Sequence, residues 1–149
     1  MKEKFVNVYM DVAERFAQLS SARRLHVGAI VVKDDRIISI GYNGMPSGWD
    51  NNCEDEIQHS DDTVTLKSKP EVLHAETNAI AKLAKSTESG DGAVLFVTHM
   101  PCLDCAKLIF QSGIRGVFYR DAYRNTDGVT FLERSGVIVK QIGDTNVAV

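Results

Sequence analysis

No hydrophobic run in the sequence is long enough to cross a membrane. The longest apolar stretches, residues 27–32 and 93–97, have the length of a strand, whereas a transmembrane helix needs about 20 apolar residues. Residues 1–5 are mostly charged and lead into an amphipathic segment, without the apolar core and small-residue cleavage site of a secretory signal. We therefore expect a cytoplasmic protein.

Basic residues are not in excess either. The formal net charge is −3 and the isoelectric point is about 5.8, whereas a protein that binds a polynucleotide usually carries a basic face. The composition thus argues against a polynucleotide partner and is compatible with a small anionic ligand. Hydrophobic residues make up 44% of the chain, which argues against disorder. The length fits one domain over residues 1–149.

Cysteine is scarce. The three cysteines are Cys53, Cys102 and Cys105, and an odd number without a secretory signal does not indicate a disulfide framework. Cys102 and Cys105 form a Cys-x-x-Cys pair, which in a reducing compartment indicates either metal binding or thiol redox chemistry.

Hydrophobic periodicity and glycine or proline punctuation predict an α/β fold. Helices are expected at residues 3–19, 71–85, 102–112 and 129–135. Strands are expected at residues 27–32, 36–40, 93–98, 114–119 and 137–141. The first two strands form a hairpin, and the later strands alternate with helices as in parallel sheets, so we expect a mixed five-stranded sheet flanked by helices. The polar residues 42–70 predict a long loop.

Two short motifs supply a set of metal ligands. They are His74-Ala-Glu76 and Pro101-Cys102-Leu-Asp-Cys105. One imidazole and two thiolates give zinc three protein ligands, and a catalytic zinc keeps its fourth position for water. Cys102 and Cys105 are three residues apart, hence on one face of a helix whose positive end favours thiolates. We expect this helix start and the one at His74 to converge on one ion.

Glu76 gives this site a proton carrier. Zinc with an open position makes water a nucleophile at neutral pH, and a carboxylate that is not a ligand can move protons between that water, the ring nitrogen of cytosine and the departing ammonia. The two motifs in this order are the signature of zinc deaminases. The alternatives are a closed structural zinc site, with Cys53, His59 or His99 as fourth ligand, and thiols that bind no metal.

On these motifs the sequence resembles the deoxycytidylate (dCMP) deaminase family, within the cytidine deaminase-like superfamily. The resemblance runs from about Arg24 to Val139 and includes residues 24–29 (RLHVGA), 41–48 (GYNGMPSG), 73–80 (LHAETNAI) and 97–109 (VTHMPCLDCAKLI). It implies a three-layer α/β fold with a five-stranded mixed sheet. It also implies zinc-dependent hydrolysis of dCMP to dUMP and ammonia, a step in dTTP precursor supply.

The resemblance makes His74, Cys102 and Cys105 the zinc ligands and Glu76 the catalytic residue. Some relatives hold a second, structural zinc with additional Cys and His residues in the first half of the chain. Here residues 20–23 read SSAR, without cysteine. We therefore predict one zinc per chain, with Cys53 as a packed thiol.

The resemblance also suggests substrate contacts. It places Asn43 against the deoxyribose, and Arg24 is the candidate for the 5′-phosphate because a guanidinium matches phosphate geometry. Tyr123, after the fourth strand, is a further contact near the base or phosphate. Arg120 and Arg124 flank Tyr123, and for these two a ligand contact and a solvated loop position both remain open.

Members of the family are commonly hexamers, activated by dCTP and inhibited by dTTP with Mg²⁺ bound to the triphosphate, so the resemblance implies a hexamer with this regulation. The region that resembles their regulatory loop is glycine-rich, so backbone amides can approach phosphates closely, although glycine and proline also mark plain turns. Its candidate residues are Gly41, Tyr42, Gly44, Pro46 and Ser47.

Other functions compete with dCMP deamination. Another cytosine nucleotide or nucleoside would suit the same zinc site, but a nucleoside would not need Arg24. Adenosine in tRNA is disfavoured by the acidic composition. A catalytically inactive, zinc-stabilised binding module is a different class of function, and Glu76 argues against it, because a purely structural site has no use for that carboxylate.

Overall fold

The computed structural model describes residues 1–143, so residues 144–149 of the predicted domain lie outside the described part. Its helices are α1 (Glu3–Ala17), α2 (Ala75–Ala84), α3 (Leu103–Gln111) and α4 (Asp127–Arg134). Its strands are β1 (Gly28–Lys33), β2 (Arg36–Tyr42), β3 (Glu54–Gln58), β4 (Val64–Ser68), β5 (Val94–His99), β6 (Gly116–Asp121) and β7 (Ile138–Gln141).

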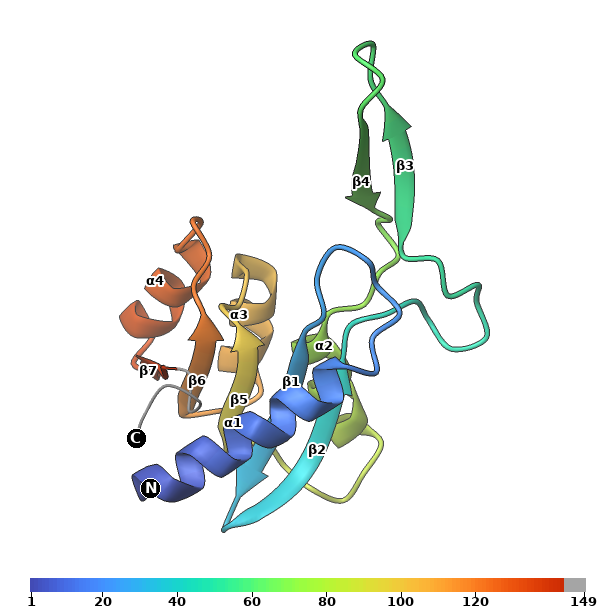
Figure 1. Cartoon of the computed structure of the whole chain (residues 1–149). Helices are drawn as coiled ribbons and strands as arrows, with labels where there is room; N and C mark the ends of the chain where they lie inside the picture. The colour runs from blue at the N-terminus through green and yellow to red at the C-terminus, as the bar shows by residue number, and fades with distance from the viewer. Residues whose placement is uncertain (144–149) are drawn as a thin grey trace.

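Five strands form one mixed sheet in the order β2-β1-β5-β6-β7 (Figure 1). β1 pairs antiparallel with both β2 and β5, whereas β5, β6 and β7 run parallel to one another. The parallel strands are joined by helices α3 and α4, because a parallel pair needs a crossover connection. This confirms the mixed five-stranded sheet predicted from the sequence.

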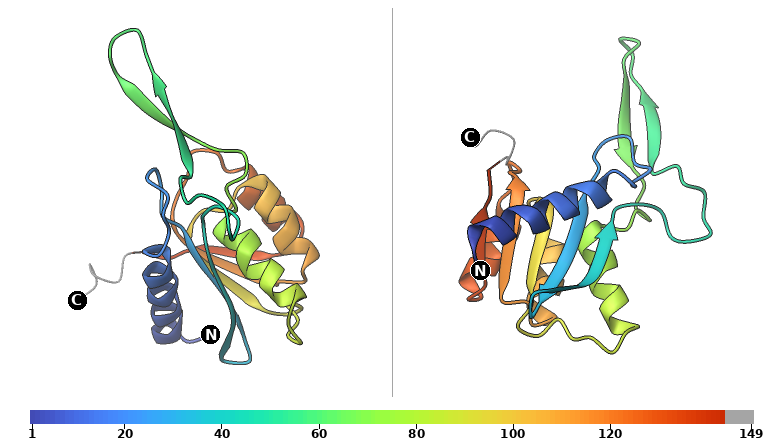
Figure 2. Two further views of the ribbon diagram at one scale, coloured as in Figure 1. Left: turned by 90° about the vertical axis from the view of Figure 1, so that its right-hand side faces the viewer. Right: turned by 60° about the horizontal axis from the view of Figure 1, so that its bottom comes forward.

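Helices cover both faces of the sheet (Figure 2). Successive side chains of a strand point to opposite faces, so in β5 Phe96 packs with Met10 of α1 while Leu95 packs with Ile109 of α3 on the other face. α1 lies on the first face, and α2, α3 and α4 contribute to the second. The chain therefore has the predicted three layers. In the part of the chain described here, no helix combines the length and apolarity that a membrane span requires.

Two glycines let helices lie directly on the sheet. A Cβ at Gly28 of β1 would lie 2.0 Å from the carbonyl oxygen of Ala13 in α1. A Cβ at Gly41 of β2 would lie 2.3 Å from the carbonyl oxygen of Ala75 in α2. Gly41, assigned above to a possible regulatory loop, is therefore a strand residue on which the start of α2 packs.

The helix that carries His74 starts later than the sequence pattern suggests, at Ala75 instead of residue 71. The cause is tertiary, because Leu73 exchanges two backbone hydrogen bonds with Gly44, of 2.8 and 3.1 Å, and is held extended. His74 thereby becomes the residue that caps α2.

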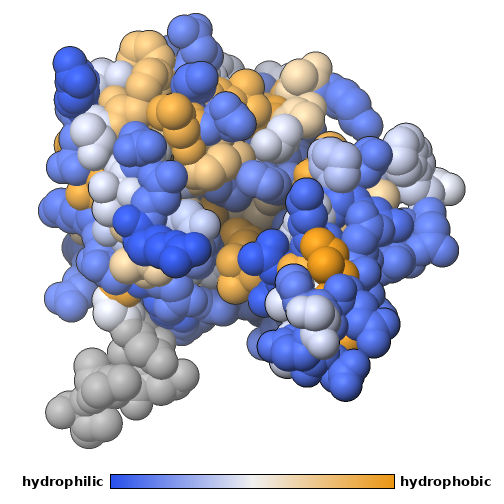
Figure 3. Space-filling view, turned by 90° about the horizontal axis from the view of Figure 1, so that it is seen from above, coloured by the Kyte–Doolittle hydropathy of each residue, from blue (hydrophilic) through white to orange (hydrophobic). Residues whose placement is uncertain are grey.

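The predicted loop at residues 42–70 contains an antiparallel hairpin, β3–β4, which projects from the body of the molecule (Figure 1). Most of its residues are exposed on both faces, so no apolar alternation marks it in the sequence. Its turn depends on polar hydrogen bonds instead, since Asp61 accepts bonds from the backbone and the hydroxyl of Thr63. Figure 3 views this side of the molecule, where many exposed residues are hydrophilic, and hydrophobic residues show in the upper part of the view and in a central hollow.

Candidate active site

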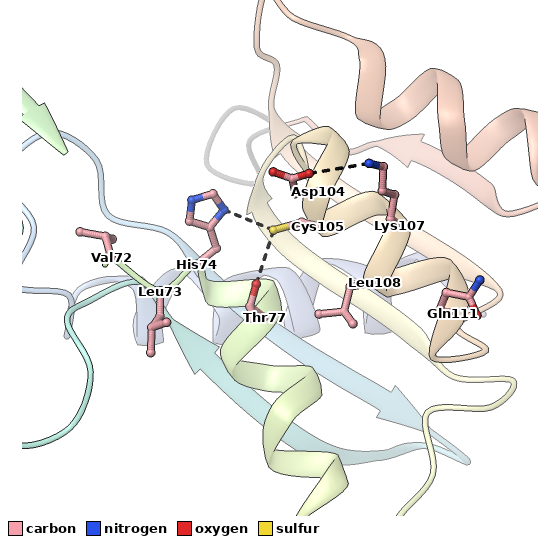
Figure 4. Close-up of a pocket in the computed structure, with 9 residues that line it drawn as sticks. All are labelled: Val72, Leu73, His74, Thr77, Asp104, Cys105, Lys107, Leu108 and Gln111. Atoms are coloured by element: carbon pink, nitrogen blue, oxygen red, sulfur yellow. Dashed lines mark hydrogen bonds and ion pairs between the residues drawn. The ribbon is translucent and has the colours of Figure 1, made fainter. Parts of the chain in front are cut away.

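His74, Cys102 and Cys105 lie together where two helices begin. His74 caps α2 and Cys102 caps α3. The Nδ1 atom of His74 lies 3.3 Å from Cys105 Sγ (Figure 4) and 3.7 Å from Cys102 Sγ. One ligand atom from each residue lies within 4.8 Å of the others, and across residues 1–143 no fourth His, Cys, Asp or Glu joins the group. One nitrogen and two sulfurs are the donor types that zinc prefers, and three protein ligands would leave the fourth position of a bound zinc for water.

Hydrogen bonds couple the three groups, and the pKa shift of Cys102 favours a form that binds metal. Hydrogen bonds from Cys105 and His74 lower the pKa of the Cys102 thiol, which favours the thiolate. The hydrogen bond to Cys102 and burial raise the pKa of Cys105, so a cation that binds there would have to displace the thiol proton. The hydrogen bond to Cys102 also raises the pKa of His74. Thr77 of α2 contacts the second sulfur, with its Oγ1 atom 3.7 Å from Cys105 Sγ.

Glu76 lies in the first turn of α2, two residues after His74, and is only 5% exposed. Burial raises the pKa of its carboxyl group to about 7. A group with a pKa near the operating pH can both accept and release a proton. Glu76 also lines the same cleft as His74 and Cys102.

That cleft, of about 560 Å³, brings the predicted catalytic and substrate residues together. Arg24, Asn43 and Tyr123 line it along with His74, Glu76 and Cys102. They come from the segment before β1, the segment after β2 and the loop after β6. The volume is in the range of small-molecule sites.

Each predicted substrate residue has a defined setting. Arg24 is exposed and donates a 3.2 Å hydrogen bond from Nη1 to Ser68 Oγ. Asn43 accepts the backbone N–H of Val27 and donates to the carbonyl of Leu25, both at 2.8 Å, so it also braces the segment that carries Arg24. The centre of the Tyr123 ring lies 5.4 Å from the centre of the His99 ring.

Several cleft residues were not found by sequence reasoning. His99, considered above only as a possible fourth ligand of a closed zinc site, lines the cleft, and its Nδ1 atom is buried without a hydrogen-bond partner within the described residues. Burial lowers the pKa of His99, while Asp121 opposes this shift. Ser68 and Lys69 reach the cleft from the end of β4. Nothing in the sequence pattern placed them there, because the hairpin itself was not predicted.

Of the two arginines that flank Tyr123, Arg120 differs from expectation. β6 continues to Asp121, so Arg120 is a strand residue and not part of a loop. Its side chain is 12% exposed and forms ion pairs with Asp11 (3.2 Å) and Glu14 (3.3 Å) of α1. Arg120 therefore holds α1 on the sheet and does not line the cleft. Arg124 is exposed in the loop between β6 and α4.

The possible regulatory residues line a different depression, of about 580 Å³. Two lysines of the α2 region, Lys82 and Lys85, border it, and Lys82 Nζ donates to the carbonyl of Ile40. The predicted residues on this depression are Tyr42, Gly44, Pro46 and Ser47, while Gly41 lies under α2.

Cys53 is buried, 3.7 Å from Ser21 Oγ, and is not part of the ligand group. This position agrees with a packed thiol.

Comparison with known proteins identifies the family. Residues 3–120 match the family described as the cytidine and deoxycytidylate deaminase zinc-binding region. The chain is 36% identical over 135 residues to ComE operon protein 2 of Bacillus subtilis, covering 90% of this chain and 69% of that protein. It is 39% identical over 127 residues to human deoxycytidylate deaminase, covering 82% and 68%.

A solved structure agrees with this assignment. The dCMP deaminase of cyanophage S-TIM5, crystallised in complex with dCMP and dUMP, superposes with a TM-score of 0.84 at 47% identity, over 95% of this chain and 99% of that one. The resemblance predicted from the motifs is thus confirmed, and the chain belongs to the cytidine and deoxycytidylate deaminase family.

Proposed function

We propose that this protein catalyses the zinc-dependent hydrolysis of dCMP to dUMP and ammonia. The observation that carries the proposal is the cleft in which the ligand residues His74 and Cys102, the buried Glu76 and the exposed Arg24 meet. The likeness to deoxycytidylate deaminases, including one crystallised with dCMP and dUMP, supports dCMP as the substrate.

The Nδ1 atom of His74 and the sulfurs of Cys102 and Cys105 would hold one zinc ion per chain. When bound, zinc acts as a Lewis acid that makes water a nucleophile at neutral pH. The convergence of two helix N-termini supports this assignment, because their positive ends favour the thiolate forms of the ligands.

Glu76 carries the protons. Its carboxyl group takes a proton from the attacking water and delivers it to the ring nitrogen N3 of cytosine. It then takes the proton of the hydroxyl now on C4 and passes it to the amine, so that the C–N bond breaks, ammonia leaves and the C4 carbonyl of the product forms. Burial suits it to this role, because a pKa of about 7 leaves both protonation states accessible at neutral pH. A buried carboxyl group beside the ligand residues argues against an inactive binding module, because a purely structural zinc site has no use for it.

Arg24 would bind the 5′-phosphate at the mouth of the cleft, Asn43 would contact the deoxyribose, and Tyr123 would lie near the base or phosphate. The exposed guanidinium of Arg24 supports the nucleotide over the nucleoside as substrate. The regulatory proposal is that dCTP and dTTP, with Mg²⁺, bind the depression bordered by Lys82 and Lys85. Hexameric assembly, a single catalytic domain and a cytoplasmic location stay predictions.

A turnover assay tests the function. Protein of measured zinc content is given dCMP or deoxycytidine, with and without dCTP and dTTP, and product formation is followed. We expect dCMP turnover, with a kcat/KM for deoxycytidine lower by orders of magnitude, because the phosphate contact is lost.

Arg24→Ala should reduce this preference, whereas Arg36→Ala, which removes an exposed arginine paired with Glu88, should not. Turnover of deoxycytidine equal to that of dCMP would contradict the assignment of substrate. Rates insensitive to both triphosphates would contradict the regulatory proposal only.

A further inference from the structure

The base of the projecting hairpin contacts the segment that carries Arg24. Glu54, the first residue of β3, is 1% exposed, although most of the hairpin is exposed. Both of its carboxyl oxygens accept the backbone N–H of Arg23, at 2.7 and 3.0 Å. A buried carboxyl group is costly without such a partner, so this contact constrains both segments.

The opposite strand of the hairpin holds the side chain of the next residue. Ser68, the last residue of β4, pairs with Glu54 in the β3–β4 register. Its hydroxyl accepts the 3.2 Å hydrogen bond from Arg24 Nη1. One pair of residues at the base of the hairpin therefore holds the backbone before Arg24 and the guanidinium of Arg24 itself.

A neighbouring ion pair, between Arg23 and Glu56, differs from the Glu54 contact in its exposure to solvent. Glu56, two residues further along β3, contacts the Arg23 side chain at 3.0 Å, but both side chains are about half exposed or more (46% and 63%). Exposed pairs of this kind contribute little. The buried hydrogen bond that the Arg23 backbone N–H donates to Glu54 is thus the stronger constraint on the segment.

We propose that Glu54 is a positioning residue for nucleotide recognition: it acts through the backbone of Arg23 to aim Arg24 at the phosphate of the substrate. This inference rests on the proposed function. Because the zinc ligands and Glu76 are held by α2 and α3 and not by the hairpin, loss of the Glu54 contact affects phosphate binding and leaves the reacting groups in place.

The experiment compares kcat and KM for dCMP and deoxycytidine in the full-length, zinc-loaded protein and in Glu54→Ala, Glu54→Gln and the control Glu56→Gln. Glu54→Ala should raise KM for dCMP about tenfold to a hundredfold, since small misplacements of a positioning group have effects of this order. The kinetics with deoxycytidine, which has no phosphate, should change little. Glu54→Gln should lie between, because its amide oxygen can still accept the Arg23 N–H, and Glu56→Gln should match wild type.

The direction in which KM for dCMP changes distinguishes a positioning role of Glu54 from a direct charge effect on the phosphate. Removing a carboxylate near a bound phosphate would by Coulomb's law alone lower KM for dCMP. A raised KM therefore indicates lost positioning. In an Arg24→Ala background, Glu54→Gln should cause no further loss in the preference for dCMP over deoxycytidine.

Three results would overturn the inference: unchanged dCMP kinetics in Glu54→Ala, equal losses with dCMP and deoxycytidine, or full additivity with Arg24→Ala. If Glu54→Ala does not fold, Glu54→Gln and Glu54→Asp are judged by the same dCMP-to-deoxycytidine ratio. Wild-type protein that does not deaminate dCMP would refute the proposed function and this inference together, whereas an active wild type with an unaltered ratio in the Glu54 variants refutes the inference alone.

Discussion

The Nδ1 atom of His74 lies 3.3 Å from Cys105 Sγ, although the two residues are 31 positions apart in sequence. Each belongs to the start of a different helix, and both helices pack on the same face of the sheet. The ligand group therefore depends on how closely α2 and α3 approach the strands beneath them. This dependence makes helix packing testable through the metal site.

Gly41→Ala should destabilise the fold and disturb the ligand group. The added Cβ would lie 2.3 Å from the carbonyl oxygen of Ala75 and 2.6 Å from the nitrogen of Ala79, so α2 must move away. Overpacking of this kind typically costs about 1–3 kcal/mol. Urea unfolding and zinc titration measure the two effects. Gly44→Ala is the matched control, because a Cβ there meets no atom within 4 Å, and equal stability of both variants would contradict the packing argument.

Glu76→Gln should lower kcat for dCMP by about 10²- to 10⁴-fold, the usual range for loss of a general acid–base group. Glutamine has nearly the same shape but cannot exchange the proton. Zinc content, measured by metal analysis, should stay at the wild-type value because Glu76 is not one of the ligand residues. Glu71→Gln, an exposed substitution just before α2, serves as control. Near-native turnover in Glu76→Gln would exclude the proposed proton transfers.

Removal of metal by a chelator should abolish turnover and lower the thermal unfolding midpoint, because an ion that binds only the folded chain stabilises it. At a free zinc concentration of about 100 times Kd this stabilisation is about 2.7 kcal/mol, which corresponds to several degrees for a chain of this size. Zinc should restore both properties. Metal analysis should return one zinc per chain in wild type and in Cys53→Ser, and two per chain would refute the assignment of Cys53 as a packed thiol.

Acidification should weaken the fold through His99. Burial lowers the pKa of His99 in the folded chain, whereas an unfolded histidine titrates at about 6.5. The unfolded chain therefore takes up the proton first. The stabilising contribution is complete above pH 6.5 and is lost as the pH falls through the lower, folded-state pKa. Urea unfolding of wild type and His99→Asn between pH 5 and 8 measures this contribution to the free energy of unfolding. Equal losses of stability in the two proteins on acidification would contradict the role of His99.

Much of the fold could be read from local patterns. The strands at residues 27–32 and 93–98 and the helix at residues 3–19 agree with β1, β5 and α1 to within two residues. The ligand motifs were also readable, since residue types and short spacings carry that information. The differences from these patterns have tertiary causes. Leu73 is not part of α2 because it pairs with Gly44. Arg120 is part of β6, and its side chain forms ion pairs with residues of α1.

The hairpin shows where the pattern method fails. β3 and β4 expose both faces, so no apolar alternation distinguishes them from a polar loop. Their pairing nevertheless brings Ser68 and Lys69 to the cleft and buries Glu54 against Arg23. Contacts between segments this far apart in sequence have no local signature.

The sequence by itself determined which side chains can bind a metal and move a proton, and in what order helices and strands follow, because these depend on residue type and on periodicity over a few positions. Only the tertiary structure decided that His74, Glu76 and Cys102 share a cleft with Arg24, and that Glu54 holds the segment from which Arg24 extends. The physical reason is that distances between remote residues arise from sheet order and from helices packing on strands, which no short stretch of chain encodes.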